Sequence, residues 1–232
     1  MIKPALPAPD VRGMFDRIAE RYDAANRVMS AGIDVLWRRK AMGLLLEGIG
    51  ETPRMLDLGA GTLDGALEIL RRRPGARVVA ADFAREMLRV GRRKAEAQRV
   101  STHAADGHRL PYADGVFDAA FSAFCVRNLR DLPVAMAELR RVVKPSGRIA
   151  ILEFFRPAKP RLFFDRFYNA HLLPLLGWAV SGDREAYRYL PASIARFASR
   201  GEFEEQLRRA GFDEISGQDL FPSGVASLVV AR

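Results

Sequence analysis

The sequence predicts an α/β fold, in which a mostly parallel sheet has helices on both faces and ends in an antiparallel hairpin. Between residues 54 and 154, short apolar runs alternate with segments of helical periodicity, a pattern typical of parallel sheets. A glycine-rich turn follows the first of these runs. Two apolar runs at residues 213–221 and 224–231 are joined by Pro222-Ser223-Gly224, a connection short enough for a hairpin.

Two segments precede the predicted sheet. Residues 1–12 contain three prolines and are expected to form a flexible lead-in, and residues 13–50 carry apolar residues at helical spacing. The alternating part of the chain follows. It has predicted strands at 54–58, 77–81, 100–105, 117–124 and 148–154, and predicted helices at 64–73, 83–98 and 132–143.

The alternation ends after the fifth predicted strand. Directly before that strand, Lys144-Pro145-Ser146-Gly147 has the residues that a tight turn favours. Residues 156–200 are rich in aromatic and aliphatic side chains and show no strand pattern, so we expect a helical insertion that is kinked at Pro174. A further helix at 202–209, ended by Ala210-Gly211, precedes the hairpin.

Length and composition indicate a soluble globular protein. The chain has 232 residues, which suits a single domain with its own core, and 49% of them are hydrophobic and 28% charged. The N-terminus lacks the apolar region of a signal peptide. The longest uncharged apolar stretch, residues 172–180, is too short to cross a bilayer, and we expect a cytoplasmic protein.

The charge is strongly basic, with 37 Lys and Arg against 28 Asp and Glu. Such a surface attracts nucleic acid, anionic lipid or anionic substrates. The basic runs at 38–40, 71–73 and 92–94 are interpreted as solvated helix faces, because no RNA-binding aromatic pattern accompanies them, and no nucleic-acid partner is expected. A single cysteine, Cys125, and three histidines without ligand spacing predict neither an intrachain disulfide nor a metal site.

The first candidate site is the turn Asp57-Leu58-Gly59-Ala60-Gly61-Thr62. Glycines after the first strand let a ligand approach the backbone at the carboxyl edge of a parallel sheet. A dinucleotide site would have a third glycine where Asp64 stands, and a carboxylate there would repel a pyrophosphate. The turn therefore favours a nucleoside with a cationic or amino group, whose ammonium Asp57 or Asp64 can hold. The alternative is a helix cap or a strand-end carboxylate bonded to the turn.

Acidic residues also end the next two predicted strands. Asp82 lies where a carboxylate accepts hydrogen bonds from ribose hydroxyls, and the alternative is an N-cap for the helix that begins at Phe83. Asp106-Gly107 follows the third strand. Its acidic side chain suits an adenine amine, and the glycine lets backbone groups come near the ring. The alternative is an ordinary turn.

These positions together resemble those of class I S-adenosylmethionine-dependent methyltransferases, which have a Rossmann-like sheet. Further motifs resemble the quinone-biosynthesis C-methyltransferases of the UbiE/MenG type, over about residues 13–232. The most specific motif is Tyr187-Arg188-Tyr189-Leu190-Pro191-x-Ser193-Ile194. The others are Phe15-Asp16 to Ser30 with Trp37, Leu110-Pro111-Tyr112-x-Asp114, Arg127-Asn128-Leu129 with Asp131, Arg141-Val142-Val143-Lys144-Pro145-x-Gly147, Leu152-Glu153-Phe154 and Ala210-Gly211-Phe212.

The resemblance implies methyl transfer from S-adenosylmethionine to a ring carbon of a polyprenylated quinol, either demethylmenaquinol or a benzoquinol. It implies that Arg127 stabilises the phenolate oxygen and that Asn128 orients a hydroxyl or a water. The alternative is a loop cap with a surface salt bridge to Asp131. Tyr22 either closes over the cofactor or is a core aromatic. The implied cofactor-binding residues are Tyr22, Asp57, Gly59, Ala60, Gly61, Thr62, Asp82, Phe83, Asp106, Gly107 and Ala123.

In this interpretation the 156–200 insertion lies on the substrate side. A prenyl tail needs an apolar groove, and a basic face can rest on the anionic inner surface of a membrane. The alternative is that the aromatic residues simply pack on the sheet. A homodimer is left open. Two other functions are considered: methylation of another lipophilic or phenolic molecule, and a non-enzymatic partner protein that binds S-adenosylmethionine.

Five positions depart from the family pattern. Leu63 stands where a glycine is common, and its side chain either crowds the methionine end of the cofactor or points into the interface between helix and sheet. Asp34 replaces a histidine, Ser146 a glycine, Phe155 a serine, and Ala123 lies where a serine is frequent. These departures bear on the choice of acceptor.

Overall fold

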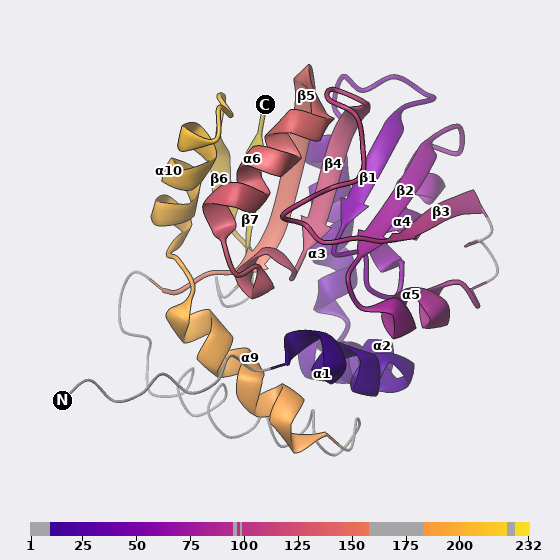
Figure 1. Ribbon diagram of the computed structural model, residues 1–232, viewed down its shortest axis with the longest axis vertical. Coiled ribbons are helices and arrows are strands. Elements are labelled where there is room, and N and C mark those ends of the chain that lie inside the picture. The colour runs from indigo at the N-terminus through magenta and orange to yellow at the C-terminus, as the bar shows by residue number, and fades with distance from the viewer. Residues whose placement is uncertain (1–9, 95–96, 98, 158–182, 222–225) are drawn as a thin grey trace.

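One seven-stranded sheet organises the fold. The computed structural model describes residues 10–94, 97, 99–157, 183–221 and 226–232. The strand order is β3-β2-β1-β4-β5-β7-β6 (Figure 1). The first five strands pair in parallel, and β7 runs antiparallel between β5 and β6. The strands are β1 Arg54–Leu58, β2 Arg77–Asp82, β3 Val100–Ala104, β4 Phe117–Ala123, β5 Val143–Phe154, β6 Ser216–Asp219 and β7 Ala226–Ala231. The predicted fold class is confirmed.

Helices cover both faces of this sheet, as the alternating pattern requires. In Figure 1, α6 and α10 lie in front of the sheet and α3 and α4 behind it, while α1, α2 and α9 lie below its carboxyl end. The helices are α1 Val11–Ile18, η1 Ala19–Arg21, α2 Tyr22–Ser30, α3 Ile33–Leu45, α4 Asp64–Arg72, α5 Arg85–Gly91, η3 Val126–Asn128, α6 Leu132–Val142, α9 Arg184–Arg196 and α10 Arg200–Arg209. No described helix has the length and apolarity that a membrane crossing requires.

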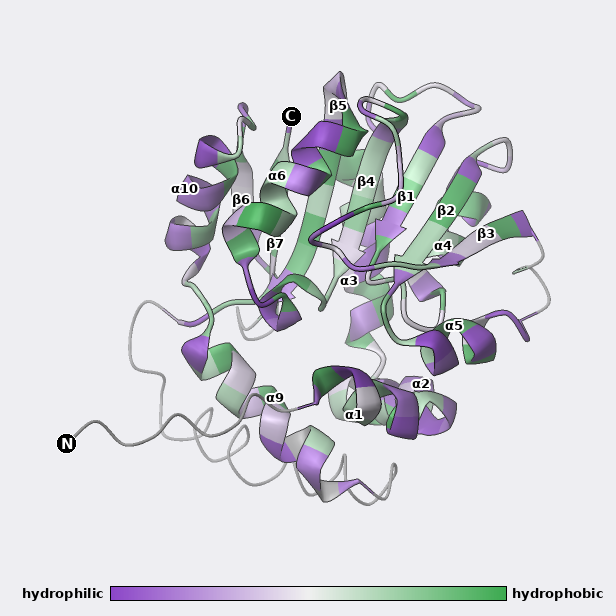
Figure 2. Ribbon diagram, in the orientation of Figure 1, coloured by the Kyte–Doolittle hydropathy of each residue, from purple (hydrophilic) through white to green (hydrophobic). Residues whose placement is uncertain are grey.

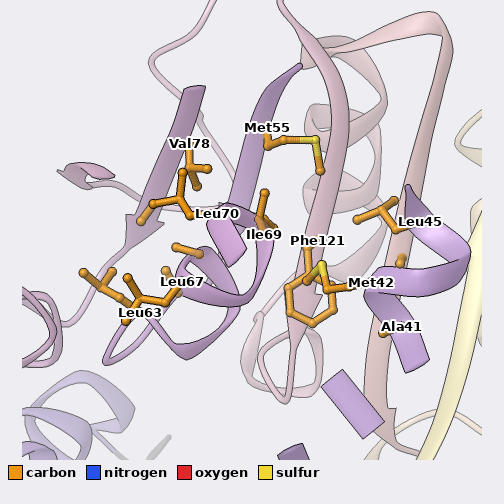
Figure 3. Close-up of a cluster of buried hydrophobic side chains, with 14 of the residues drawn as sticks. Ala41, Met42, Leu45, Met55, Leu63, Leu67, Ile69, Leu70, Val78 and Phe121 are labelled. Carbon is orange, nitrogen blue, oxygen red and sulfur yellow. The ribbon is translucent and has the colours of Figure 1, made fainter. Parts of the chain in front are cut away.

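Two hydrophobic layers hold the sheet between these helices. Side chains alternate across each strand, so Met55 faces α3 and α4 whereas Leu56 faces α6 and α10. Figure 2 shows the central strands mostly hydrophobic and the outer surface of α10 hydrophilic. Figure 3 shows the layer on the α3 and α4 side, where Met42 and Phe121 meet. Each large side chain buried here contributes about 2 kcal/mol of transfer free energy.

The N-terminal helices begin earlier than predicted. The α1 helix starts at Val11, and Asp10 caps it by accepting a hydrogen bond from the Gly13 N–H at 2.9 Å. The predicted boundary at residue 13 is therefore wrong by two residues, because Asp10 is an N-cap residue and the helix begins directly after it. Residues 1–9, the rest of the predicted lead-in, lie outside the described residues.

The predicted tight turn before the fifth strand is wrong. Residues 144–147 belong to β5, which already pairs with β4 at Val143 opposite Phe117 and resumes at Arg148 opposite Ala119. They form a bulge in which β5 has extra residues opposite Asp118. A Cβ on Gly147 would lie 2.8 Å from the Asp118 carbonyl oxygen, so the turn-like glycine serves a close approach between strands.

Two other predicted elements differ in extent. The predicted helix at 83–98 is in fact the short α5, which begins at Arg85 and ends at Gly91, where glycine disfavours continuation. Within the predicted insertion, α9 is the described helix, and the predicted kink at Pro174 lies outside the described residues. The C-terminal strands pair antiparallel as predicted, although β6 is shorter than the run that predicted it.

Candidate active site

The predicted site residues come together at the carboxyl ends of the parallel strands. The loops after β1, β2, β3 and β4 end at the edge of the sheet that faces α1, α2 and α9 (Figure 1). Parallel strands place such loops at one edge, and ligands of open α/β sheets bind there.

The turn after β1 needs its glycines. Gly59 and Gly61 have φ of 69° and 51°, in the left-handed region that favours glycine. The Gly59 and Ala60 N–H groups both donate to the Ala81 carbonyl, at 2.7 and 3.2 Å. A Cβ on Gly59 would lie 2.2 Å from the Cys125 sulfur, so this turn packs directly against the loop after β4.

Asp82 fastens the end of β2 to this turn. Its carboxylate accepts a hydrogen bond from the Gly61 N–H and another from the Ala84 N–H, each at 2.8 Å. Burial raises the pKa of Asp82 to about 6. The capping alternative predicted Asp82 as the N-cap of the following helix. The N-cap of α5 is instead Ala84, two residues after Asp82. Each carboxylate oxygen can accept a second hydrogen bond, such as one from a ribose hydroxyl.

Asp57 and Asp64, the two candidates for an ammonium, have different surroundings. Asp64 is already paired with Lys94 at 2.6 Å and with Arg27 at 2.8 Å. Burial opposes its ionisation, but Lys94 and the neighbouring arginines hold its pKa below the usual value. Asp57 is only 2% exposed, and its Oδ2 has no hydrogen-bond partner in the part of the chain that the structure describes.

Burial raises the pKa of Asp57 to about 7, against the opposing effect of the Ala66 N–H. Because the folded state then holds this proton more tightly than the unfolded state, Asp57 lowers stability as pH rises from about 4 to about 7. Between pH 5 and pH 8 this decline amounts to about 2 to 3 kcal/mol, at about 1.4 kcal/mol per pKa unit, and we expect Asp57→Asn to remove it. Urea unfolding of both proteins at pH 5 and pH 8 measures the difference. Parallel pH profiles for the two proteins would contradict this expectation.

Leu63 points into the core and not toward the turn's open side. It has no exposed surface and a φ of 71°, and it lies beside Leu67 in the hydrophobic layer of Figure 3. A Cβ on Gly91 of α5 would lie 2.6 Å from the Leu63 Cγ, which shows how closely this side chain packs on α5. Of the two predicted alternatives, the structure therefore favours the interface between helix and sheet.

Replacing Leu63 should show two opposing effects. Leu63→Gly relieves the positive φ, worth about 1 kcal/mol, but deletes a buried side chain worth about 2 to 5 kcal/mol. We expect a net loss of about 2 kcal/mol in the free energy of unfolding. Leu63→Ala is the matched control, and it should be less stable than Leu63→Gly because alanine keeps the backbone strain. Denaturant titration compares the stabilities of the two variants. Leu63→Ala would be the more stable one if the backbone at residue 63 had a negative φ.

Asp106 is held by His108, a residue that the sequence did not single out. The His108 N–H and Nδ1 contact the Asp106 carboxylate at 2.9 and 2.5 Å, and the backbone bond is the main cause of the lowered pKa of Asp106. The His108 Nε2 accepts the Asp131 N–H at 3.1 Å. Gly107 is buried, and a Cβ there would lie 3.1 Å from Leu129, so the loops after β3 and β4 touch.

Arg127 is buried in an ion pair with Glu153. The Nη1 to Oε1 distance is 2.6 Å, with side-chain exposures of 6% and 0%. The Arg127 N–H also donates to the Glu153 carboxylate at 3.2 Å. Burial raises the pKa of Glu153, while Arg127 opposes the rise. The predicted alternative, a surface salt bridge to Asp131, is wrong, because Asp131 instead caps α6 through the Val134 N–H.

Asn128 is fixed at both ends of its amide. Its Nδ2 donates to the Phe124 carbonyl at 3.3 Å, and its Oδ1 accepts a hydrogen bond from the Tyr189 hydroxyl at 3.0 Å. Phe124 has a φ of 56°, a strained conformation for an aromatic residue. Such strain is often found at functional sites, and here it turns one carbonyl toward both Arg127 and Asn128.

Aromatic side chains stand next to this pair. Phe124 stacks on Phe154 at 4.6 Å between ring centroids, and the ring of Trp37 lies 6.4 Å from Phe124. Guanidinium groups approach both phenylalanine rings: Arg38 lies 5.8 Å above Phe124, and Arg127 lies 5.7 Å above Phe154. We call Trp37, Phe124 and Phe154 the aromatic cluster.

The remaining predicted cofactor residues are Tyr22, Phe83, Thr62 and Ala123. Tyr22 packs with Phe15 and with Met87 of α5, and burial raises its pKa. It also belongs to a small core shared by α1, α2 and α9, as the core alternative predicted. Phe83 lies 6.5 Å from Phe15 between ring centroids. The Thr62 hydroxyl donates to the Asp23 carboxylate at 2.5 Å. Ala123 is the last residue of β4 and pairs in register with Leu152 of β5.

Two other departures from the family pattern also lie in packing positions. Phe155 is buried and stacks on Phe197 at 5.6 Å between ring centroids, within the layer beneath α10. Asp34 is buried between Arg27 and Arg38. Among the described residues, neither side chain makes a recorded contact with Arg127 or Asn128, although Asp34 pairs with Arg38, which lies over the ring of Phe124.

The strand order, the glycine turn after β1 and the acidic residues after β2 and β3 define a class I S-adenosylmethionine-dependent methyltransferase. A solved S-adenosylmethionine-dependent methyltransferase from Thermotoga maritima shares this fold, with a TM-score of 0.65 at 18% identity over 95% of this chain and 98% of that one. The chain belongs to the ubiE/COQ5 methyltransferase family, whose model matches residues 5–231. It is therefore a methyltransferase with S-adenosylmethionine as donor, as the motifs predicted.

Two relatives show how close the likeness is. Demethylmenaquinone methyltransferase of Thermus thermophilus is 44% identical over 222 residues, which cover 94% of this chain and 98% of the relative. Ubiquinone/menaquinone biosynthesis C-methyltransferase UbiE of Syntrophotalea carbinolica is 42% identical over 233 residues, which cover 98% of this chain and 96% of the relative.

Proposed function

We propose that this protein is a C-methyltransferase of quinone biosynthesis that converts demethylmenaquinol to menaquinol. The observation that carries the proposal is the position of Arg127 and Asn128 beside the aromatic cluster at the carboxyl ends of β4 and β5. A cationic group and an amide next to stacked rings suit an aromatic acceptor that develops negative charge on oxygen. The printed names of the two relatives support a quinol as that acceptor.

The chemistry asks little of the protein beyond position and charge. The ring carbon of a quinol becomes a good nucleophile when a neighbouring hydroxyl loses its proton. The new carbon–carbon bond would form as the methyl–sulfur bond breaks, with S-adenosylhomocysteine as the leaving group, and water would then take the proton that the attacked carbon carried. Bound S-adenosylmethionine supplies the electrophilic methyl group. Arg127 lowers the energy of the phenolate through its charge, and Asn128 donates an N–H to the same oxygen or to a water beside it.

The cofactor half of the site is assigned to the loops after β1, β2 and β3. Asp82 accepts the ribose hydroxyls, Asp106 the adenine amine, and Asp57 the ammonium of the methionine part. The buried, unpartnered Oδ2 of Asp57 supports this last assignment, because a buried acceptor without a donor is costly. The backbone of Gly59, Ala60 and Gly61 lets the cofactor approach, and Tyr22, Thr62, Phe83, Gly107 and Ala123 border it.

The deciding experiment is methyl transfer from isotopically labelled S-adenosylmethionine in detergent. Reduced demethylmenaquinone and its benzoquinol counterpart are offered separately, and the products are identified by mass. We expect label on the ring of the naphthoquinol. Label on the benzoquinol alone would replace the proposed acceptor, and no label on either, with folded protein, would refute a quinol substrate.

A polyprenylated tail brings the membrane into the proposal. The tail would leave the site toward the 156–200 insertion, whose residues 158–182 lie outside the described part of the chain. Peripheral contact with an anionic membrane therefore remains a prediction from the composition of that segment, as does a homodimer.

A further inference from the structure

The α9 helix brings a hydroxyl to each of the two residues assigned to the acceptor. The Tyr189 hydroxyl donates to the Asn128 Oδ1 at 3.0 Å, and the Ser193 hydroxyl accepts the Arg127 Nε–H at 3.4 Å. Residues four apart lie on the same face of a helix, so a single face of α9 contacts both. Both residues belong to the motif at residues 187–194, for which the sequence alone predicted no role.

The contact with Tyr189 decides which way the Asn128 amide points. An amide has an acceptor end and a donor end, and the wrong orientation would set oxygen against oxygen at the Phe124 carbonyl. With the Tyr189 hydroxyl on Oδ1 and the Phe124 carbonyl on Nδ2, one N–H of the amide remains for the acceptor. That N–H is the group that the proposed mechanism uses.

The contact with Ser193 is fixed in direction as well. Ser193 is buried, and its hydroxyl donates a hydrogen bond to the Leu190 carbonyl at 2.8 Å. Its hydroxyl therefore meets Arg127 as an acceptor only. The Arg127 Nη1 donates to Glu153 and to the Phe124 carbonyl, and Nε donates to Ser193. Among the described residues, none accepts a hydrogen bond from Nη2, the third nitrogen of the guanidinium group.

We propose that Tyr189 is a positioning residue for methyl transfer, supported by Ser193, and that α9 sets the geometry of the acceptor pair. The inference rests on the proposed roles of Arg127 and Asn128. Tyr189 acts through the Asn128 amide and does not touch the reacting atoms. Removing its hydroxyl frees the amide to rotate away from the productive direction, which affects turnover more than binding.

The test is Tyr189→Phe, which deletes one oxygen and keeps the ring. We expect turnover to fall about tenfold, as for a lost orienting contact, with the affinity for S-adenosylmethionine unchanged. Tyr112→Phe is the matched control, since its hydroxyl contacts His103 at 3.1 Å away from the site, and it should keep full turnover. The double variant Asn128→Ala with Tyr189→Phe should be no slower than Asn128→Ala alone.

A second measurement does not depend on the acceptor. Amide hydrogen exchange at residues 126–129, in protein without substrate, should become about fivefold faster in Tyr189→Phe, the factor for one lost hydrogen bond, and stay unchanged in Tyr112→Phe. Full turnover in Tyr189→Phe, or losses that multiply in the double variant, would overturn the inference. If the wild-type protein methylates no quinol, the proposed function is refuted. In that case, amide exchange at residues 126–129 that is unchanged in Tyr189→Phe would still overturn the positioning role.

Discussion

Arg127→Ala should reduce methyl transfer by at least about tenfold and lower the free energy of unfolding by about 3 to 5 kcal/mol. The loss of stability follows from Glu153, which has no exposed surface and would be left as a buried carboxyl without its cation. The loss of turnover follows from the missing positive charge beside the phenolate. Affinity for S-adenosylmethionine, measured by calorimetry, should remain, because Asp57, Asp82 and Asp106 lie in or directly after β1, β2 and β3, whereas Arg127 lies after β4.

A double variant separates these two effects. In Arg127→Met with Glu153→Leu, both charges are replaced by apolar groups of similar volume, which often restores or exceeds the original stability. We expect urea unfolding to return to near the wild-type midpoint while turnover stays low. A double variant with wild-type turnover would show that the buried pair is purely structural, and Arg127 would then leave the mechanism.

Asp82→Ala should weaken binding of S-adenosylmethionine by roughly 100-fold or more, the factor for two lost charged hydrogen bonds. The same carboxylate holds the Gly61 and Ala84 N–H groups, so the variant should also loosen the glycine turn. Calorimetric titration measures the affinity, and urea unfolding measures the change in stability. Affinity equal to the wild type would remove Asp82 from the ribose site.

Asp82→Asn distinguishes the turn from the ligand. It keeps the size of the side chain, but its NH₂ group would face one of the two backbone N–H groups from which the carboxylate accepts hydrogen bonds. We expect it to weaken binding less than Asp82→Ala. Equal effects of the two variants would mean that the loss comes from the collapse of the turn and not from the ribose contacts.

The parts of the fold that the sequence predicted well are those with a strong local pattern. β1 and β2 appear as apolar runs and end at Leu58 and Asp82, as expected. The bulge at residues 144–147 was missed because Pro145 and Gly147 also favour tight turns, and only the pairing with β4 shows that the strand continues. The close approach of Gly91 to Leu63 could not be predicted, because no local pattern reveals a contact between residues this far apart in the chain.

For the candidate site, the positions of its residues at strand ends were easier to predict than the contacts between their side chains. The sequence placed Asp57, Asp82 and Asp106 at strand ends, and the structure brings their loops to one edge. It did not predict that Glu153 pairs with Arg127, although a charged residue inside an apolar strand was a usable signal. The hydrogen bond from the Asp131 N–H to His108 could not be predicted, because these two residues are distant in the chain.

Besides the small apolar cluster around Met87, ion pairs join the N-terminal helices to α4 and to the segment around α5. Arg27 reaches Asp64, Asp23 reaches Lys94 at 2.9 Å, and Glu20 reaches Arg89 at 2.8 Å. These pairs are partly exposed, whereas the sheet is held by buried apolar layers. The distance over which exposed charges interact falls from about 10 Å at 0.1 M salt to about 3 Å at 1 M, so high salt weakens such pairs. High ionic strength should therefore weaken the attachment of these helices to the loops after β1 and β2 more than it weakens the sheet, which is held by buried apolar layers.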